Sequence, residues 1–166
     1  MSFPQSVGFA APQASRVAHA VDAAERLARL RLARSENIGP RTFLNLVIRF
    51  GSAQAAIEAL PALAARGGRA AYAPWDEGRA SEELARGSEA GARILMIGDE
   101  EYPARLLSIS NPPPVLWLLG DAGLFARPAV AMVGARNASA LGLRLARRLA
   151  DELGAEGQVV VSGLAR

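Results

Sequence analysis

Residues 129–166 read AVAMVGARNASALGLRLARRLADELGAEGQVVVSGLAR, and this stretch decides the fold. Its two apolar runs, 129–133 and 158–161, are typical of buried strands. Between them, leucines recur at every fourth position from Leu141 to Leu153, which predicts one apolar face of a helix. Ser139 is placed to cap that helix, and Gly154 and Gly157 are expected to end it. Strand, helix and strand form a βαβ unit, so we expect parallel strands joined by a right-handed crossover.

Small polar residues follow both predicted strands, where an α/β sheet binds its ligands. Gly134 and the pair Ser162-Gly163 let a ligand approach the backbone, and free amides at a helix start favour an anion. Arg136 adds a cation whose fork of donors matches phosphate, so this interpretation predicts a phosphate site. The alternative is that the glycines only permit a tight turn and Arg136 is a solvated surface charge. Neither GxGxxG nor GxxxxGK[ST] is present, so ordinary dinucleotide and P-loop sites are not indicated.

Residues 133–142 (VGARNASALG) and 160–166 (VVSGLAR) resemble the two signatures of the DNA-processing protein A family, called DprA or Smf. The chain has Ala135 where the family commonly has a serine or threonine, and Leu141 where it commonly has a tyrosine. The expected ligand site therefore lacks that hydroxyl and that aromatic ring. The resemblance implies a non-enzymatic protein without cofactor or metal that binds single-stranded DNA and helps to load RecA recombinase during natural transformation. It also implies a homodimer in the complete protein. The DNA- or phosphate-binding residues it implies are Gly134, Arg136, Asn137, Ser139, Gly142, Ser162, Gly163 and Arg166.

Composition sets bounds on the protein class. All 19 basic residues among the 166 are arginine, and with 16 acidic residues the net charge is +3, which gives mild support for an anionic partner. The absence of cysteine excludes disulfides and thiolate metal sites. No apolar run approaches membrane-spanning length and no secretory signal is recognisable, so the chain is expected to be cytoplasmic and free of membrane contact.

The N-terminal half predicts a mobile tail at 1–16 and a helical module at 17–73. A first helix over 17–34 is expected to keep its arginines opposite its apolar side. Pro40 suits the start of a second helix that ends at Gly51, and Ser52 can cap a third that ends at Pro61. This resembles a helix-hairpin-helix or sterile-alpha-motif-like module, in which the hairpin can offer amides to DNA phosphates. Asn37 replaces a common glycine, and a plain helical packing domain, able to fold alone over about 17–65, is the favoured interpretation.

Residues 74–166 are expected to form a Rossmann-like domain, incomplete at its C-terminus. Tyr72 and Trp75 are interpreted as anchors between helices rather than as platforms for bases. Further strands are predicted at 93–97 and 115–119, which with the two strands above form one doubly wound, mostly parallel sheet. The run from Tyr102 through 112–119 again resembles the DprA pattern. The fold class is therefore α/β: an all-helical module followed by a partial Rossmann-like sheet. Because the second signature is cut at Arg166, the parent protein is expected to be longer.

No catalytic constellation stands out in the sequence. The pairs Glu82-Glu83 and Glu100-Glu101 have no partner base and are expected to be solvated. Ser162 follows a strand as a nucleophile can, but the single histidine, His19, lies in the polar N-terminal segment. The alternative function is a Rossmann-like enzyme or carrier that binds a nucleotide phosphate, similar to the lysine-decarboxylase-like phosphoribohydrolases. The helical module and the 102–119 run favour the DNA-binding interpretation.

Overall fold

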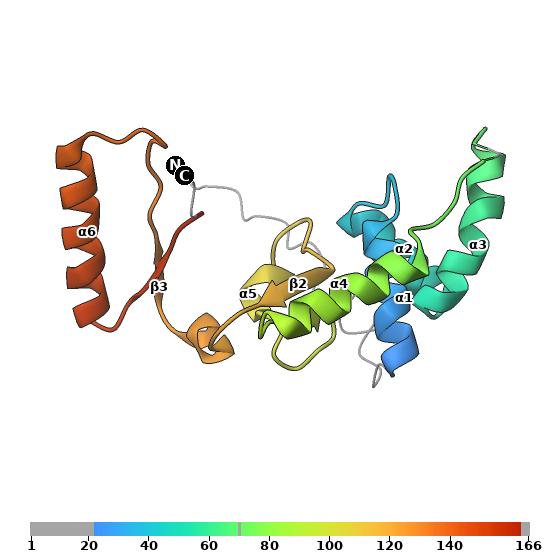
Figure 1. Cartoon of the computed structure of the whole chain (residues 1–166), viewed down its shortest axis with the longest axis horizontal. Coiled ribbons are helices and arrows are strands. Elements are labelled where there is room, and N and C mark those ends of the chain that lie inside the picture. The colour runs from blue at the N-terminus through green and yellow to red at the C-terminus, as the bar shows by residue number, and fades with distance from the viewer. Residues whose placement is uncertain (1–21, 70, 164–166) are drawn as a thin grey trace, which may run out of the picture. The chain divides into compact units, whose positions relative to one another are not determined.

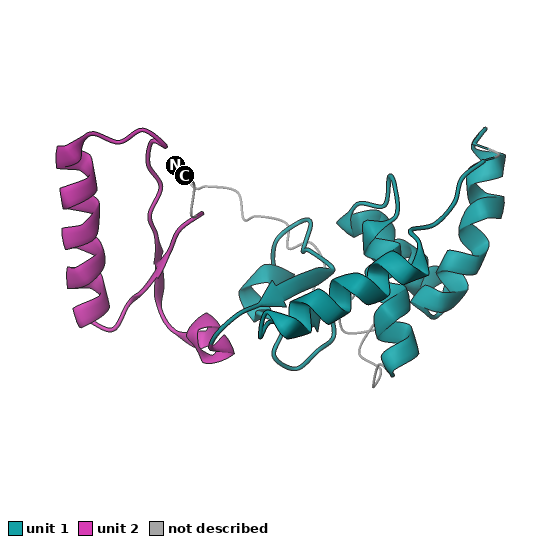
Figure 2. Ribbon diagram, viewed as in Figure 1, with its two compact units in different colours: residues 1–120 teal, residues 121–166 magenta. Residues whose placement is uncertain are grey.

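The computed structural model describes residues 22–69 and 71–163. The tail expected at 1–16, His19 and Arg166 lie outside these residues. The chain divides into two compact units, residues 1–120 and 121–166 (Figure 2). A helical part is followed by small sheets, one of them parallel, which confirms the α/β class with a partial Rossmann-like part. The domain boundary expected between 73 and 74 stays a prediction, whereas the internal contacts divide the chain after Gly120.

Three helices open the first unit: α1 (Ala23–Arg34), α2 (Pro40–Phe50) and α3 (Ala53–Arg66) (Figure 1). As the sequence predicts, Pro40 stands at the start of α2, and Gly51 ends it with a φ of 81°, the left-handed conformation that glycine adopts freely. The Ser52 hydroxyl oxygen accepts the Ala55 N–H at 3.1 Å and so caps α3. The helices enclose a core of Ala28, Leu32, Phe43, Leu46, Val47, Ala53, Ala56, Ile57 and Leu60.

The third helix does not end at Pro61, where the sequence predicts its end. Instead α3 runs through Pro61 to Arg66. Proline removes one backbone hydrogen bond from a helix, and its ring clashes with the carbonyl of the preceding turn. A helix is therefore usually predicted to end before a proline. Here Ile57 and Leu60 before the proline, and Leu63 after it, pack on the same core. Their three-residue spacing keeps one face buried across the proline, so tertiary packing outweighs the local penalty.

The rest of the first unit comprises α4 (Glu77–Glu89), β1 (Arg93–Met96), α5 (Ala104–Leu107) and β2 (Val115–Leu118). The strands pair antiparallel, with Arg93 opposite Leu118 and Met96 opposite Val115. They form a two-stranded sheet, and their antiparallel pairing differs from the mostly parallel order expected from the sequence. Residues 97–114 connect β1 to β2, and their helix α5 has only four residues, whereas a parallel crossover usually contains a longer helix that packs on the sheet.

The first helix joins the helical module to this antiparallel pair through buried and ion-paired side chains. Leu30 is fully buried in a second core with Ala80 and Met96. Arg29, expected on a solvated face, is only 3% exposed, and it donates to the Ile97 carbonyl at 2.9 Å and to the Glu25 carboxylate at 3.1 Å. The Glu25 carboxylate in turn accepts the Ala53 N–H at the start of α3. The arginine face of α1 is therefore an internal contact surface.

The second unit contains a short 3₁₀ turn η2 (Ala122–Ala126), β3 (Ala129–Ala131), α6 (Ala140–Ala155) and β4 (Val159–Val161). The strands β3 and β4 are parallel and α6 lies beside them (Figure 1), which confirms the predicted βαβ order. Gly154 lies inside α6, whereas Gly157, with a φ of 78°, follows its end. Across the described residues, no single helix is long and apolar enough to span a membrane. Only α2 and α3 taken together pass that test, with a bend of 105° between them.

Candidate nucleic-acid interface

The two strand ends of the second unit bring both signature segments to one edge. Ala131, the last residue of β3, pairs with Val161, the last residue of β4. The ladder continues for one more bond, from the Met132 N–H to the Val161 carbonyl at 2.8 Å. Gly134 follows on one chain segment and Ser162-Gly163 on the other. Gly134 and Ser162, which are 28 positions apart in the sequence, therefore follow strands that end at the same carboxyl edge of the sheet. This is the edge at which α/β sheets bind ligands.

Ser139 and Gly142 form the start of α6. The Ser139 hydroxyl oxygen accepts the Gly142 N–H at 3.1 Å, and the Ser139 carbonyl accepts the Leu143 N–H at 2.9 Å. The predicted cap is therefore present, and it satisfies one of the amides that the helix start offers to an anion. A side chain at position 142 would meet the Ser139 hydroxyl oxygen at 3.5 Å, which is an ordinary contact. Contacts within the described chain thus do not require glycine there.

Gly134 and Gly163 are both open to approach from outside. A Cβ built on either residue would meet no heavy atom within 4 Å, and neither is among the residues with positive φ. Neither backbone conformation nor packing within the described residues explains glycine at these two positions. What glycine does provide is an uncovered backbone that a ligand can approach closely.

Arg136 and Asn137 lie between Gly134 and the cap, in an exposed bend. In the described part of the chain, neither side chain has a hydrogen-bond or ion-pair partner. Arg136 is therefore a solvated cation in this structure, and both interpretations of it made from the sequence remain open. Ser162 and Gly163 are exposed as well, directly after β4.

The charges along α6 are segregated. Arg144, Arg147 and Arg148 lie in its first nine residues, whereas Asp151 and Glu152 lie in its second half. Arg148 donates to Glu152 at 2.7 Å, so that arginine is partly neutralised. The end of α6 that follows the Arg136 bend thus carries only cations and the positive end of the helix dipole. Arg144 and Arg147 were not among the residues predicted from the sequence, although arginines in the first turns of a helix that follows a bend containing glycine are a pattern typical of anion binding.

The helical hairpin of the first unit is the second place where the sequence offers a contact with DNA phosphates. Asn37 has a φ of 62°, the left-handed conformation for which a hairpin glycine is usually chosen, and asparagine tolerates it. Gly39 precedes α2 without a side-chain cap on the helix start. The hairpin geometry is thus formed despite the substitution, and contact with DNA at this hairpin stays a prediction.

Other residues considered from the sequence have structural partners. Tyr72 packs on the helical core and Trp75 on the second core, so both are anchors between elements. Glu83 accepts two hydrogen bonds from Arg34, at 2.7 and 3.0 Å, and one from the Trp117 indole at 2.9 Å. Hydrogen bonding by Arg34 lowers the pKa of Glu83 against the opposing effect of burial. Glu83 is therefore not the solvated residue expected, and exposed Glu101 is ion-paired with Arg93.

Comparison with known proteins divides the chain into two matches. Residues 23–85 match the family model described as the DprA-like N-terminal HHH domain, and residues 93–166 match the model described as DNA recombination-mediator protein A. A DNA processing protein DprA of Bacillus subtilis (strain 168) is 39% identical over 83 residues. That alignment includes 49% of this chain and 28% of the relative, so the aligned part is under a third of that protein.

Proposed function

Because this chain belongs to the DNA-processing protein A family, we propose that it binds single-stranded DNA and helps to load RecA recombinase onto it during natural transformation. The family assignment supports DNA processing in general. The finer proposal, a single-strand site at the carboxyl edge of β3 and β4, is supported by the geometry of that edge. RecA as a partner, and a homodimer in the complete protein, are proposed from the family alone.

The observation that carries the DNA proposal is the Ala131–Val161 pairing, because it brings the two signature segments together. Beside it lie uncovered glycine backbone at Gly134 and Gly163 and the unpartnered cation of Arg136. Phosphate contacts position a nucleic acid without reading its sequence, and an exposed arginine beside open backbone amides fits that task. We therefore propose Gly134, Arg136, Asn137, Ser139, Gly142, Ser162, Gly163 and Arg166 as the residues of this site.

We propose binding rather than catalysis as the role of this site. Two of the four acidic residues considered as catalysts, Glu83 and Glu101, are engaged by Arg34 and Arg93, which supports a structural use for both. No cofactor or metal is part of the proposal. We place the activity in the cytoplasm, where a recombinase would receive the strand.

Titration of labelled oligo-dT against the chain and its Arg136→Ala variant tests the proposal. Losing one charge-assisted phosphate contact is expected to cost about 1.5–3 kcal/mol, and the slope of log K against log salt should fall by about 0.7. Arg105→Ala, which removes an exposed arginine of α5, is the matched control and should bind as the parent does. Labelled AMP serves as the competing ligand. AMP binding without oligo-dT binding would replace the proposal by the nucleotide-phosphate alternative, and unchanged binding by Arg136→Ala would remove Arg136 from the site.

A further inference from the structure

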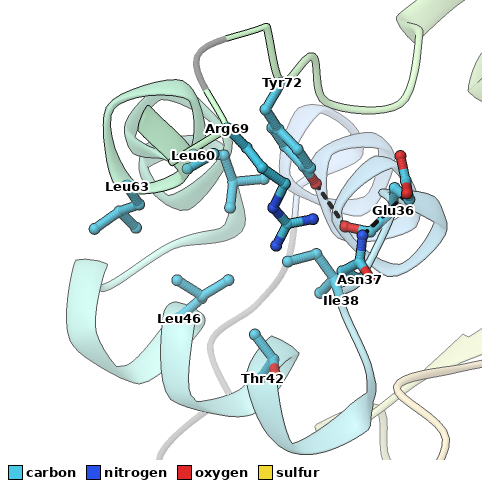
Figure 3. Close-up of a pocket in the computed structure, with 10 residues that line it drawn as sticks. Glu36, Asn37, Ile38, Thr42, Leu46, Leu60, Leu63, Arg69 and Tyr72 are labelled. Atoms are coloured by element: carbon cyan, nitrogen blue, oxygen red, sulfur yellow. Dashed lines mark hydrogen bonds between the residues drawn. The ribbon is translucent and has the colours of Figure 1, made fainter. Parts of the chain in front are cut away.

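A pocket of about 210 Å³ lies in the helical module of the first unit. It is lined by residues of the hairpin after α1, by the facing sides of α2 and α3, and by Arg69 and Tyr72 (Figure 3). Its floor is aliphatic: Leu46 and Leu60 are buried and Leu63 is half-buried. An apolar cavity of about 150 Å³ takes up benzene. This pocket therefore has room for one leucine- or phenylalanine-sized side chain.

Arg69 supplies the cation of this pocket. Figure 3 shows its guanidinium pointing inward between the leucines and the Tyr72 ring. The central carbon of the guanidinium, Cζ, lies 5.9 Å from the centre of that ring. Among the described residues, Arg69 makes no ion pair. The fork of a guanidinium matches a carboxylate or a phosphate, so the pocket combines an apolar floor with one anion-binding group.

The wall opposite the floor is fixed. The Tyr72 hydroxyl donates to the Glu36 carbonyl at 2.9 Å, and the Asn37 side-chain amide donates to the Glu36 carboxylate at 3.1 Å. Burial raises the pKa of Tyr72, although the Ser35 hydroxyl and the Arg69 charge partly oppose the shift, so the phenol stays a donor at neutral pH. The Tyr72 ring and hydroxyl are thus already engaged.

These features distinguish between two kinds of occupant. A DNA base needs a free aromatic ring to stack on, and Tyr72, the aromatic residue of this pocket, is already engaged with Arg69 and with the Glu36 carbonyl, while the floor is aliphatic. A protein segment needs only an apolar side chain for the floor and a carboxylate for Arg69. Charge complementarity and the aliphatic floor therefore favour a peptide.

We propose that this pocket docks a partner protein through one large apolar side chain followed directly by an acidic residue, with the apolar group on Leu46, Leu60 and Leu63 and the carboxylate on Arg69. The proposal does not depend on DNA binding at the other unit. It assigns the helical module a protein-binding role.

The test is an NMR titration of the ¹⁵N-labelled full chain with three blocked dipeptides. The probe is acetyl-Leu-Asp-amide, and its controls are acetyl-Leu-Asn-amide, which lacks only the charge, and acetyl-Ala-Asp-amide, which lacks the apolar group. The probe should shift the amides of Glu36, Ile38, Ala64, Arg69 and Tyr72. Each control should bind about fivefold more weakly, the scale of one exposed ion pair or of part of an apolar side chain.

Two arginine variants make the test specific. In Arg69→Gln, the Leu-Asp and Leu-Asn dipeptides should bind equally. In Arg66→Gln, which removes an exposed arginine at the end of α3 outside the pocket, the preference for Leu-Asp should be unchanged. Circular dichroism confirms that both variants keep the parent's helicity. The proposal is overturned if no dipeptide shifts these amides, if Arg69→Gln keeps the preference, or if oligo-dT shifts them and displaces the dipeptide.

Discussion

Arg26 and Asp99, 73 residues apart, form a two-pronged ion pair with nitrogen–oxygen distances of 2.9 and 3.0 Å. The same guanidinium donates to the Ile94 carbonyl at 2.8 Å, and the Asp99 carboxylate accepts the Met96 N–H at 2.8 Å. The pair therefore ties α1 to the end of β1 and to the turn after it. Its partly buried setting makes the loss of one partner costly, because the other is left without compensation.

Replacing Asp99 by alanine should lower the free energy of unfolding by about 2 kcal/mol, since it leaves the Arg26 charge and the Met96 amide without their acceptor. Urea denaturation followed by circular dichroism measures the change. Glu100→Ala, which removes an exposed carboxylate at the next position, should have an effect within about 0.5 kcal/mol. Equal losses in the two variants would show that the ion pair contributes nothing specific.

A fragment of residues 22–73 should be much less stable than a fragment of residues 22–120. The sequence suggests an independent helical module over about 17–65, but Leu30 is buried against Ala80 and Met96, and Arg29 donates to the Ile97 carbonyl. The short fragment exposes Leu30 and leaves Arg29 without that acceptor. Thermal melts of both fragments measure the difference. The same melting temperature for both would show that the helical module folds independently of residues 74–120.

Replacing Gly87 by alanine should destabilise the first unit by about 1–3 kcal/mol, the usual cost of overpacking. A Cβ at this position in α4 would overlap the Trp117 ring, which the bond from its indole to Glu83 holds in place. Alanine has the better helix propensity by about 1 kcal/mol, so a gain in stability would show that the ring moves away freely. Ser88→Ala, at an exposed position of the same helix, is the control.

Stability should fall in acid partly through Glu83. Hydrogen bonds from Arg34 hold the pKa of its carboxyl below the usual 4.5 in the folded chain. A depressed folded pKa gives a contribution that is complete above the unfolded pKa and is lost as pH falls through the folded value. Glu83→Gln should therefore unfold with a shallower pH dependence below about pH 5, whereas Glu82→Gln should keep the parent's slope. Urea midpoints between pH 3 and 7 test this, and parallel slopes for parent and Glu83→Gln would contradict it.

Sequence reasoning worked where the signal is local. Pro40, Gly51, Ser52 and Ser139 begin or end helices where they were predicted to, because capping depends on bonds within a few residues. The parallel pairing of β3 with β4 also followed from the local strand–helix–strand pattern.

Sequence reasoning failed where partners are distant. The continuation of α3 through Pro61 depends on packing against α2. The burial of Arg29 depends on the carbonyl of Ile97, the residue that follows β1. Glu83 was read as solvated because nothing near it in sequence indicates Trp117. At the proposed DNA site, the sequence predicted which segments meet at the strand ends, whereas the exposure of Arg136 and the open backbone of Gly134 required the structure.

The buried contact of Arg29 with Ile97 has a consequence for the chain as it is synthesised. The two residues are 68 positions apart, and a ribosome adding about 5–20 residues per second needs roughly 3 to 14 s to cover that distance. During that interval α1 has emerged without the strand that completes its surroundings. The nascent helical module therefore presents the apolar Leu30, and the Arg29 guanidinium without its Ile97 acceptor, until β1 is made, and this is the period in which chaperone binding or proteolysis would act on it.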